Sequence, residues 1–244
     1  MSPFKFKKFS VSQDRTAMKI GTDGVLLGAW ANIDHDPNSI LDIGTGTGII
    51  ALMLAQRSQA ELIDALEIDP DAYEQGVENF ENSDWGDRLF CYHASFAEFV
   101  EEMKTEQEYD LIVSNPPFYE PPLTPPKGED LISEARKNAR FYDSLPFGDL
   151  LQGVSFLLSE SGIFSVIIPK KEEENFIAIA ESFDLQPNRI THIKGTPTSE
   201  IKRSLIDFSF QKKETKPEIL VIEKSRHDYT EDYITLVKDF YLKM

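Results

Sequence analysis

The sequence predicts an α/β fold with a mostly parallel, Rossmann-like sheet of seven strands, helices on both faces and an antiparallel C-terminal strand. Two observations support this prediction. From about residue 39 onwards, short apolar runs alternate with amphipathic ones, and strand–helix alternation is typical of a parallel sheet covered by helices. The length of 244 residues also suits one α/β domain with a large core and is short for two.

The first strand–helix units follow from local signals. The apolar run at 39–43 leads through a loop of glycine and threonine into a helix at 46–57, and a second strand is expected at 61–68. Pro70 then stands where the first turn of a helix tolerates proline, so we expect a helix at 70–82. A strand at 89–93, a helix at 96–103 and a strand at 109–114 follow.

A long interruption separates these units from the rest of the fold. The segment 119–146 is rich in proline and charge, and long loops in compact domains are often functional, so we expect a substrate-side loop there. Beyond it, helices are expected at 147–158 and 171–183, and strands at 162–168, 189–194 and 204–212. An extension at 217–244 adds a strand-like run at 219–222 and a helix at about 229–242.

The composition indicates a single cytoplasmic domain spanning 1–244, without a membrane segment. No apolar run approaches the roughly 20 residues of a transmembrane helix, and the N-terminus lacks the apolar core of a signal peptide. The single cysteine, Cys91, excludes an internal disulfide. The histidines have no metal-ligand spacing, so we expect no metal, and we expect a monomer. These histidines are His35, His93, His192 and His227.

The net charge of −17, taken alone, argues against a nucleic-acid partner. Binding depends on the local potential rather than on total charge, however, and the basic residues of this chain occur in small clusters. Each cluster by itself is best explained as solvated surface charge. The composition therefore leaves a nucleic-acid substrate open.

The loop after the first strand has the character of a ligand-binding turn. It runs from Asp42 to Gly48, and its glycines let the backbone approach a ligand and expose N–H groups at the start of the helix. The spacing G-x-G-x-G lacks the third glycine of a dinucleotide fingerprint. Asp42 would repel a pyrophosphate but suits the ammonium group of an amino acid. The loop therefore favours a ligand without a pyrophosphate.

A carboxylate at the next strand end completes the cofactor signature. Glu67 can accept hydrogen bonds from both ribose hydroxyls, and Ile68 would pack on an adenine face. A ligand with ribose, adenine and an ammonium group, but no phosphate, fits S-adenosylmethionine (SAM). Many SAM enzymes carry an acid after the third strand that accepts the adenine amino group; Ala94 lacks this acceptor, so Ser95 or a backbone carbonyl is expected to replace it. The residues expected to bind the cofactor from this region are Asp42, Gly44, Thr45, Gly46, Gly48, Glu67, Ile68 and Ser95, with Asn115 beside them.

The fourth strand ends in the tetrapeptide Asn115-Pro116-Pro117-Phe118, which we expect to be catalytic. Its prolines fix the backbone and remove two N–H donors, so the Asn115 side-chain oxygen and the Pro116 carbonyl are free to accept hydrogen bonds. Two such acceptors orient a planar, conjugated NH2 group with its lone pair towards a methyl donor. Phe118 offers a face on which a flipped base can stack. The alternative, a rigid loop with a buried phenylalanine, does not explain its place after a complete cofactor signature.

With these motifs the sequence resembles the amino-group-modifying class I SAM methyltransferases, and more narrowly the bacterial valine-tRNA (adenine-N6)-methyltransferase family. The narrower resemblance depends on the run from Phe9 to Trp30, which contains Lys-x-Gly-Thr-Asp-Gly at 19–24. It implies that residues 1–38 cap the cofactor pocket, that Lys19 approaches the methionine carboxylate, and that Thr22 and Asp23 line the pocket. The family's tetrapeptide usually ends in tyrosine; here Phe118 precedes Tyr119, and either ring is a candidate for stacking.

The resemblance also implies a tRNA substrate, methylated at the N6 amino group of the adenine next to the anticodon. A localised basic surface at the catalytic side would then contact phosphates despite the acidic remainder of the chain. The residues expected to contact RNA are Lys5, Lys7, Lys8, Tyr119, Arg136, Lys137 and Arg140.

Other functions are compatible with part of these motifs. A glutamine amide is also a planar NH2, so a release-factor-type protein glutamine methyltransferase shares the tetrapeptide chemistry, as does an rRNA guanine amino-methyltransferase. Glutamine methyltransferases usually carry a separate helical N-terminal domain, and too few residues precede Asp42 for one. A non-catalytic SAM- or RNA-binding module is disfavoured by the intact tetrapeptide, and an oxidoreductase by the glycine spacing.

Overall fold

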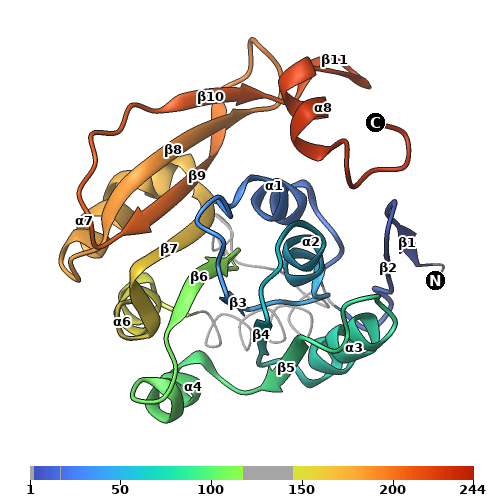
Figure 1. Ribbon diagram of the computed structural model, residues 1–244. Helices are drawn as coiled ribbons and strands as arrows, with labels where there is room; N and C mark the ends of the chain where they lie inside the picture. Colours follow the sequence, from blue (N-terminus) through green and yellow to red (C-terminus); the bar gives the residue numbers. More distant parts are fainter. Residues whose placement is uncertain (1–2, 17, 118–144) are drawn as a thin grey trace, which may run out of the picture.

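The computed structural model describes residues 3–16, 18–117 and 145–244, and an eight-stranded sheet forms its centre (Figure 1). The strand order is β10-β8-β9-β7-β6-β3-β4-β5. Neighbouring strands are parallel, except that β9 pairs antiparallel with both β7 and β8. The strands are β3 (Ser39–Ile43), β4 (Leu62–Glu67), β5 (Leu89–His93), β6 (Tyr109–Ser114), β7 (Leu158–Pro169), β8 (Gln186–Lys194), β9 (Ile201–Ser209) and β10 (Glu218–Val221).

Helices cover both faces of this sheet, and each face has its own hydrophobic cluster (Figure 1). One face carries α1 (Thr22–Trp30), α2 (Ile49–Arg57), α3 (Pro70–Glu81) and α8 (Glu231–Val237). The other carries α4 (Phe96–Met103), α6 (Phe147–Leu157) and α7 (Glu173–Glu181), with a 3₁₀ turn at Lys170–Glu172 before α7. All five residues of β3 are buried, as expected for a central parallel strand covered on both sides.

The expected fold class is confirmed, and several elements lie where the sequence predicts them. The strands at 89–93 and 109–114 and the helix at 96–103 have the predicted bounds. Asp69 caps α3 by accepting a hydrogen bond from the Ala72 N–H, with Pro70 in the first turn. The antiparallel C-terminal strand is β9.

Several expectations were wrong in detail, and one helix was not expected. The sheet has eight strands rather than seven, because the 219–222 run pairs in parallel with β8 as β10. The helix expected from 46 begins at Ile49, because Gly44, Gly46 and Gly48 have φ of 72°, 58° and 78°. The helices expected at 171–183 and 229–242 are shorter. The helix α1 was missed, because every residue from Gly24 to Trp30 is buried and no polar face marks it.

The N-terminal and C-terminal segments lie side by side (Figure 1). The strands β1 (Phe4–Lys5) and β2 (Ser10–Val11) form an antiparallel hairpin. This hairpin packs on the C-terminal segment, where the Lys7 N–H donates to the Phe240 carbonyl at 2.8 Å and Phe6 pairs with Tyr241. A small second hairpin, β11 (Glu223–Ser225) and β12 (Asp228–Tyr229), precedes α8. In the described ranges, no helix is both long and apolar enough to cross a membrane.

Candidate functional site

The sheet register brings the main candidate residues together at one edge. Ile43 at the end of β3 pairs with Leu66 of β4 on one side and with Ser114 of β6 on the other. Gly44, Glu67 and Asn115 each follow these residues by one position, so they lie at the same level on three adjacent strands. At about 4.8 Å between neighbouring strands, the three residues fall within roughly 10 Å of one another. This is the carboxyl edge of a parallel sheet, where ligands bind in such folds.

The glycine loop and Glu67 form one hydrogen-bonded unit. One carboxylate oxygen of Glu67 accepts from the Gly46 N–H at 2.8 Å, and the other accepts from the Asp69 N–H at 2.9 Å. Two backbone donors therefore fix the carboxylate, while each oxygen keeps a further lone pair for a ligand hydroxyl. A Cβ added to Gly44 or Gly46 would meet no atom within 4 Å, so the loop borders open space.

Asp42 lies directly beneath this loop. Its side chain is fully buried, and one carboxylate oxygen accepts from the Thr45 hydroxyl at 2.6 Å and from the Ala51 N–H at 3.3 Å. The other oxygen, Oδ1, is buried without a hydrogen-bond partner among the described residues. Burial raises the pKa of Asp42 to about 7. A cationic ligand group reaching Oδ1 would supply the missing donor and favour the ionised form.

The two residues expected around an adenine ring differ in whether their side chains are already engaged in the fold. Ile68 is 48% exposed and is available for an apolar contact. Ser95 is the N-cap of α4: its hydroxyl donates to Glu98 at 2.6 Å and accepts from the Glu98 N–H, which forms a capping box. Ser95 thus has a structural role in the fold, and its contact with an adenine stays a prediction.

The first three residues of the expected catalytic tetrapeptide lie at this edge. The Ser114 hydroxyl donates to the Ile43 carbonyl at 3.0 Å, which fixes the end of β6 against the strand that leads into the glycine loop. Asn115 is half-buried, Pro116 is buried and Pro117 is exposed. Phe118, Tyr119, Arg136, Lys137 and Arg140 lie outside the described residues, as does nearly all of the loop expected at 119–146.

The expected cap contacts its surroundings in ways the sequence did not predict. The Lys19 ammonium donates to the Gln13 carbonyl. Thr22 is exposed at the start of α1, and the next residue, Asp23, forms an ion pair with Arg203 at 2.8 Å. Because Arg203 pairs with Pro169 at the carboxyl end of β7, this ion pair holds the start of α1 at the same sheet edge as the glycine loop. The proposed contacts of Lys19, Thr22 and Asp23 with a cofactor stay predictions.

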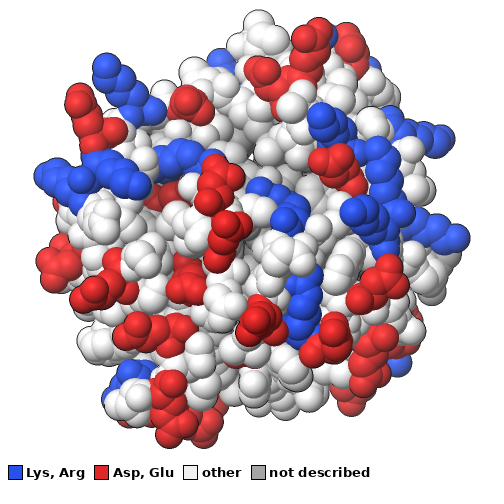
Figure 2. All heavy atoms as spheres, viewed as in Figure 1, with Lys and Arg blue, Asp and Glu red and all other residues white. Residues whose placement is uncertain are grey.

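The N-terminal lysines lie on the β1–β2 hairpin: Lys5 in β1, and Lys7 and Lys8 between the two strands. Figure 2 shows basic side chains gathered over the β1–β2 hairpin and the adjoining C-terminal segment. Lys7 donates to the carbonyls of Lys238 and Met244. The hairpin also packs against Trp85, which follows α3 and so lies towards the amino ends of the strands. An RNA contact by Lys5, Lys7 or Lys8 stays a prediction.

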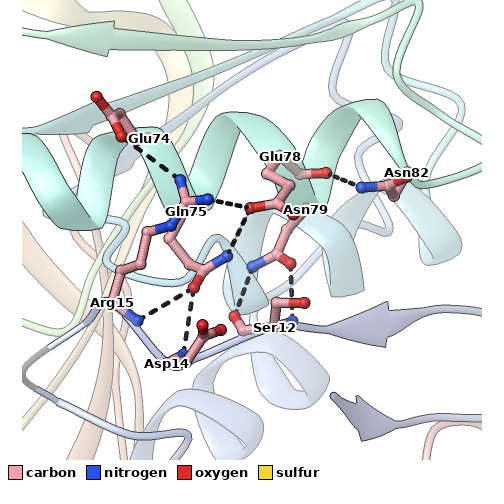
Figure 3. A network of polar contacts seen from close by, with 8 residues as sticks. All are labelled: Ser12, Asp14, Arg15, Glu74, Gln75, Glu78, Asn79 and Asn82. Atoms are coloured by element: carbon pink, nitrogen blue, oxygen red, sulfur yellow. Dashed lines mark hydrogen bonds and ion pairs between the residues drawn. The ribbon is translucent and has the colours of Figure 1, made fainter. Parts of the chain in front are cut away.

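Two functional candidates on α3 were missed by the sequence analysis. The side-chain amides of Gln75 and Asn79 are buried and hydrogen-bonded to the backbone of the N-terminal segment at Ser12, Asp14 and Arg15 (Figure 3). Polar residues on the inward face of a helix that begins at a cofactor edge are the signal that was available in the sequence. Among the described residues, no group of three or more histidines, cysteines or acids is arranged to hold a metal ion.

Comparisons with known proteins agree with this geometry. The Methyltransferase small domain model matches residues 20–140. A tRNA1(Val) (adenine(37)-N6)-methyltransferase of Christiangramia forsetii is 64% identical over 99% of this chain and 98% of its own length. The chain belongs to the tRNA1(Val) (adenine(37)-N6)-methyltransferase family. A relative from Flavobacterium psychrophilum with the same name is 62% identical over 99% of this chain and all of its own length.

Solved structures extend the likeness at the level of the fold. A predicted O-methyltransferase of Agrobacterium tumefaciens superposes with a TM-score of 0.67 over 89% of this chain and 96% of that one, at 19% identity. As a member of its family, the chain is a SAM-dependent methyltransferase. The residues present suit that cofactor: an orphaned carboxylate oxygen of Asp42, an open glycine loop and a fixed Glu67 carboxylate.

Proposed function

We propose that this enzyme transfers the methyl group of SAM to the N6 amino group of an adenine in tRNA, next to the anticodon of a valine tRNA. The substrate follows from the names of relatives that are similar over nearly the whole chain. The site chemistry is compatible with it, because an adenine N6 is a planar, conjugated NH2 group of the kind that an Asn-Pro-Pro loop can orient.

Each site residue has a definite task in this proposal. Glu67 accepts the ribose hydroxyls, Ile68 packs on the adenine ring of the cofactor, and Asp42 accepts from the ammonium group. SAM held there supplies an electrophilic methyl group. The Asn115 side-chain oxygen and the Pro116 carbonyl accept the two N6 hydrogens and so orient the nitrogen lone pair. No strong general base is required before attack, since methylation itself acidifies the nitrogen.

The observation that carries the proposal is the shared register of Gly44, Glu67 and Asn115. It puts the groups expected to bind the cofactor next to the group expected to bind the acceptor nitrogen. The same chemistry would serve an rRNA guanine amino group or a protein glutamine amide, but relatives with the tRNA1(Val) name, 62–64% identical over 98–100% of their length, favour tRNA. We further propose a monomeric, cytoplasmic enzyme of one domain, with 1–38 as the cap, 119–146 as the substrate-side loop and 217–244 as an extension.

The decisive experiment measures tritiated-methyl transfer from SAM into RNA and protein fractions of a strain that lacks this enzyme. We expect label in tRNA alone, and nuclease digestion should locate N6-methyladenosine in one valine isoacceptor. Label in ribosomal RNA or in protein, with none in tRNA, would replace this proposal with one of the alternatives.

A further inference from the structure

Two buried amides on α3 occupy a position between the glycine loop and the N-terminal segment. Gln75 is fully buried and Asn79 is 3% exposed. Four residues apart, they project from the same side of the helix (Figure 3). Buried amides need hydrogen-bond partners, and both of these find partners in the N-terminal segment, about 60 residues away along the chain.

Asn79 joins three segments with one side chain. Its oxygen accepts from the Ser12 N–H at 2.8 Å, and its NH2 group donates to the Ser12 carbonyl at 2.9 Å and to the Thr47 carbonyl at 2.8 Å. Ser12 belongs to the N-terminal segment and Thr47 to the glycine loop. Both amide hydrogens are therefore used, and the two segments are held at a fixed separation.

Gln75 extends this attachment by one helical turn. Its oxygen accepts from the Asp14 and Arg15 N–H groups at 3.2 and 3.3 Å. Gln13, between the attached residues, accepts from the Ile20 N–H at 2.9 Å and from the Lys19 ammonium. The chain segment that leads to the expected cofactor contacts at Lys19, Thr22 and Asp23 is thus hydrogen-bonded to α3 where it begins.

The same helix also shapes the glycine loop. A Cβ added to Gly76 would lie 3.5 Å from the Gly46 carbonyl oxygen, and a Cβ added to Gly48 would lie 2.4 Å from Phe80. Gly76, Asn79 and Phe80 therefore form one inward face against the loop. The positions of the loop and of the N-terminal cap are set by a single rigid element.

We propose that Asn79, supported by Gln75, is a positioning residue for SAM binding, because it holds the glycine loop and the cap in the spacing that encloses the cofactor. The proposal rests on the proposed function, in which SAM binds between these segments. Neither amide needs to touch the cofactor. Their removal should therefore weaken cofactor binding without changing the orientation of the acceptor nitrogen at Asn115.

The test is calorimetric titration of the purified full-length protein with SAM. We expect Asn79→Ala to raise the Kd about tenfold, from the loss of up to three hydrogen bonds partly replaced by water. Asn82→Ala is the matched control: it removes the same side chain three residues later, where the Asn82 amide is exposed and donates to the Glu78 carbonyl at 2.7 Å. Its Kd should stay within twofold of the wild type.

Further readouts separate positioning from a general loss of stability. Steady-state kinetics on tRNA should show a raised KM for SAM with kcat within twofold. Amide exchange of residues 12–20 should slow when SAM is added to the wild type and should change less in Asn79→Ala. If Asn79→Ala does not fold, Gln75→Ala takes its place with the same expectation. Two results would overturn the inference. One is a lowered melting temperature of the variant with an unchanged Kd for SAM. The other is a wild-type amide exchange rate at residues 12–20 that does not change when SAM is added.

The same data distinguish this inference from the proposed function. A wild-type protein that binds SAM but methylates no tRNA contradicts the proposed function and leaves the Asn79 result interpretable. A wild type that methylates tRNA beside an Asn79→Ala variant with normal SAM affinity contradicts only the positioning role.

Discussion

The two halves of the sheet hold their polar side chains in different ways. In the cofactor half, β3 to β5 with α2 and α3, the side chains of Glu67 and Asn79 are bonded to backbone groups. In the substrate half, β6 to β9, the clusters around Asp207 and Glu173 are built from side chains that bond one another. There Asp207 accepts from Ser165 at 2.6 Å and from Arg189 at 2.9 Å.

A second side-chain cluster in the substrate half shows the same principle. Glu173 accepts from Lys170 at 2.9 Å, from Ser204 and from His192. Burial opposes its ionisation, but the hydrogen bonds from Ser204 and Lys170 and the nearby His192 outweigh this, so the pKa of Glu173 lies below its usual value. The Asp207 and Glu173 clusters link neighbouring elements, whereas the Glu67 carboxylate, fixed by two backbone N–H groups, keeps a lone pair on each oxygen for a ligand. This difference distinguishes side chains that stabilise the fold from side chains that remain available to bind a ligand.

Asn115 is the residue of the substrate half that should behave as a ligand-binding group, and its change should have the largest effect. Asn115→Ala removes one of two acceptors for the reacting NH2, so we expect kcat to fall about 10³-fold. The SAM Kd should stay within a few fold, because the cofactor residues lie on β3 and β4. Single-turnover methylation and calorimetry measure both. Retained turnover would contradict the proposed chemistry.

The next largest effect should come from the cofactor half. Glu67→Gln keeps the size of the side chain but replaces one acceptor oxygen by a donor, opposite a Gly46 or Asp69 N–H. We expect the SAM Kd to rise roughly 50-fold, with little change in melting temperature. Glu61→Gln, at an exposed acid before the same strand, is the matched control. Equal Kd values for the two variants would remove Glu67 from the cofactor site.

These two sites could be predicted because of where they lie in the sequence. Asp42, Glu67 and Asn115 stand at or next to the ends of apolar runs, and the carboxyl ends of parallel strands meet at one edge. Gln75 and Asn79 gave a weaker signal, since their partners Ser12, Asp14 and Arg15 are about 60 residues away and only folding brings them together.

The limits of the fold prediction have the same cause. The strand at 109–114 was located from local apolar pattern alone, whereas the edge position of β10 depends on pairing with β8. Helix α1 could not be predicted because it is buried on all sides, so its sequence lacks the alternation of polar and apolar faces that marks a surface helix. Long-range pairing and complete burial are properties of the folded chain that a local pattern does not contain.

A change in the Glu173 cluster should affect stability and leave SAM binding intact. Glu173→Gln leaves Lys170 and His192 without a charged acceptor, and we expect the free energy of unfolding at pH 7 to fall by about 2 kcal/mol. Because the folded-state pKa is lowered, this contribution is fully present above the usual value of 4.5 and is lost as the pH falls through the folded value. Urea unfolding of both proteins at pH 7 and pH 4 measures it. A difference that grows towards pH 4 would contradict this account.

The smallest expected effect concerns pH and Asp42. Since the pKa of Asp42 is raised to about 7, its ionisation must accompany binding of a cationic group below that pH. The SAM Kd should rise about tenfold for each pH unit below 7 and level off above it. Without SAM, the free energy of unfolding should change with pH in the opposite direction. Between the usual pKa of 3.8 and the folded-state pKa of about 7, the folded state binds more protons than the unfolded state. The stability of the wild type, relative to Asp42→Asn, should therefore fall as the pH rises through this range. Titrations from pH 5.5 to 8.5 test the first effect, and a flat wild-type profile would place the ammonium elsewhere.

The pairing of Phe6 and Lys7 with residues near position 240 has a consequence for biosynthesis. A growing chain presents the hairpin phenylalanines Phe4 and Phe6 to solvent first and their partner Tyr241 more than 230 residues later. Phe9 can contact Trp85 early, but we expect Phe6 and Lys7 to gain their C-terminal partners last. A ribosome-bound fragment ending before residue 238 should hold the glycine loop but leave the hairpin open to proteases and chaperones.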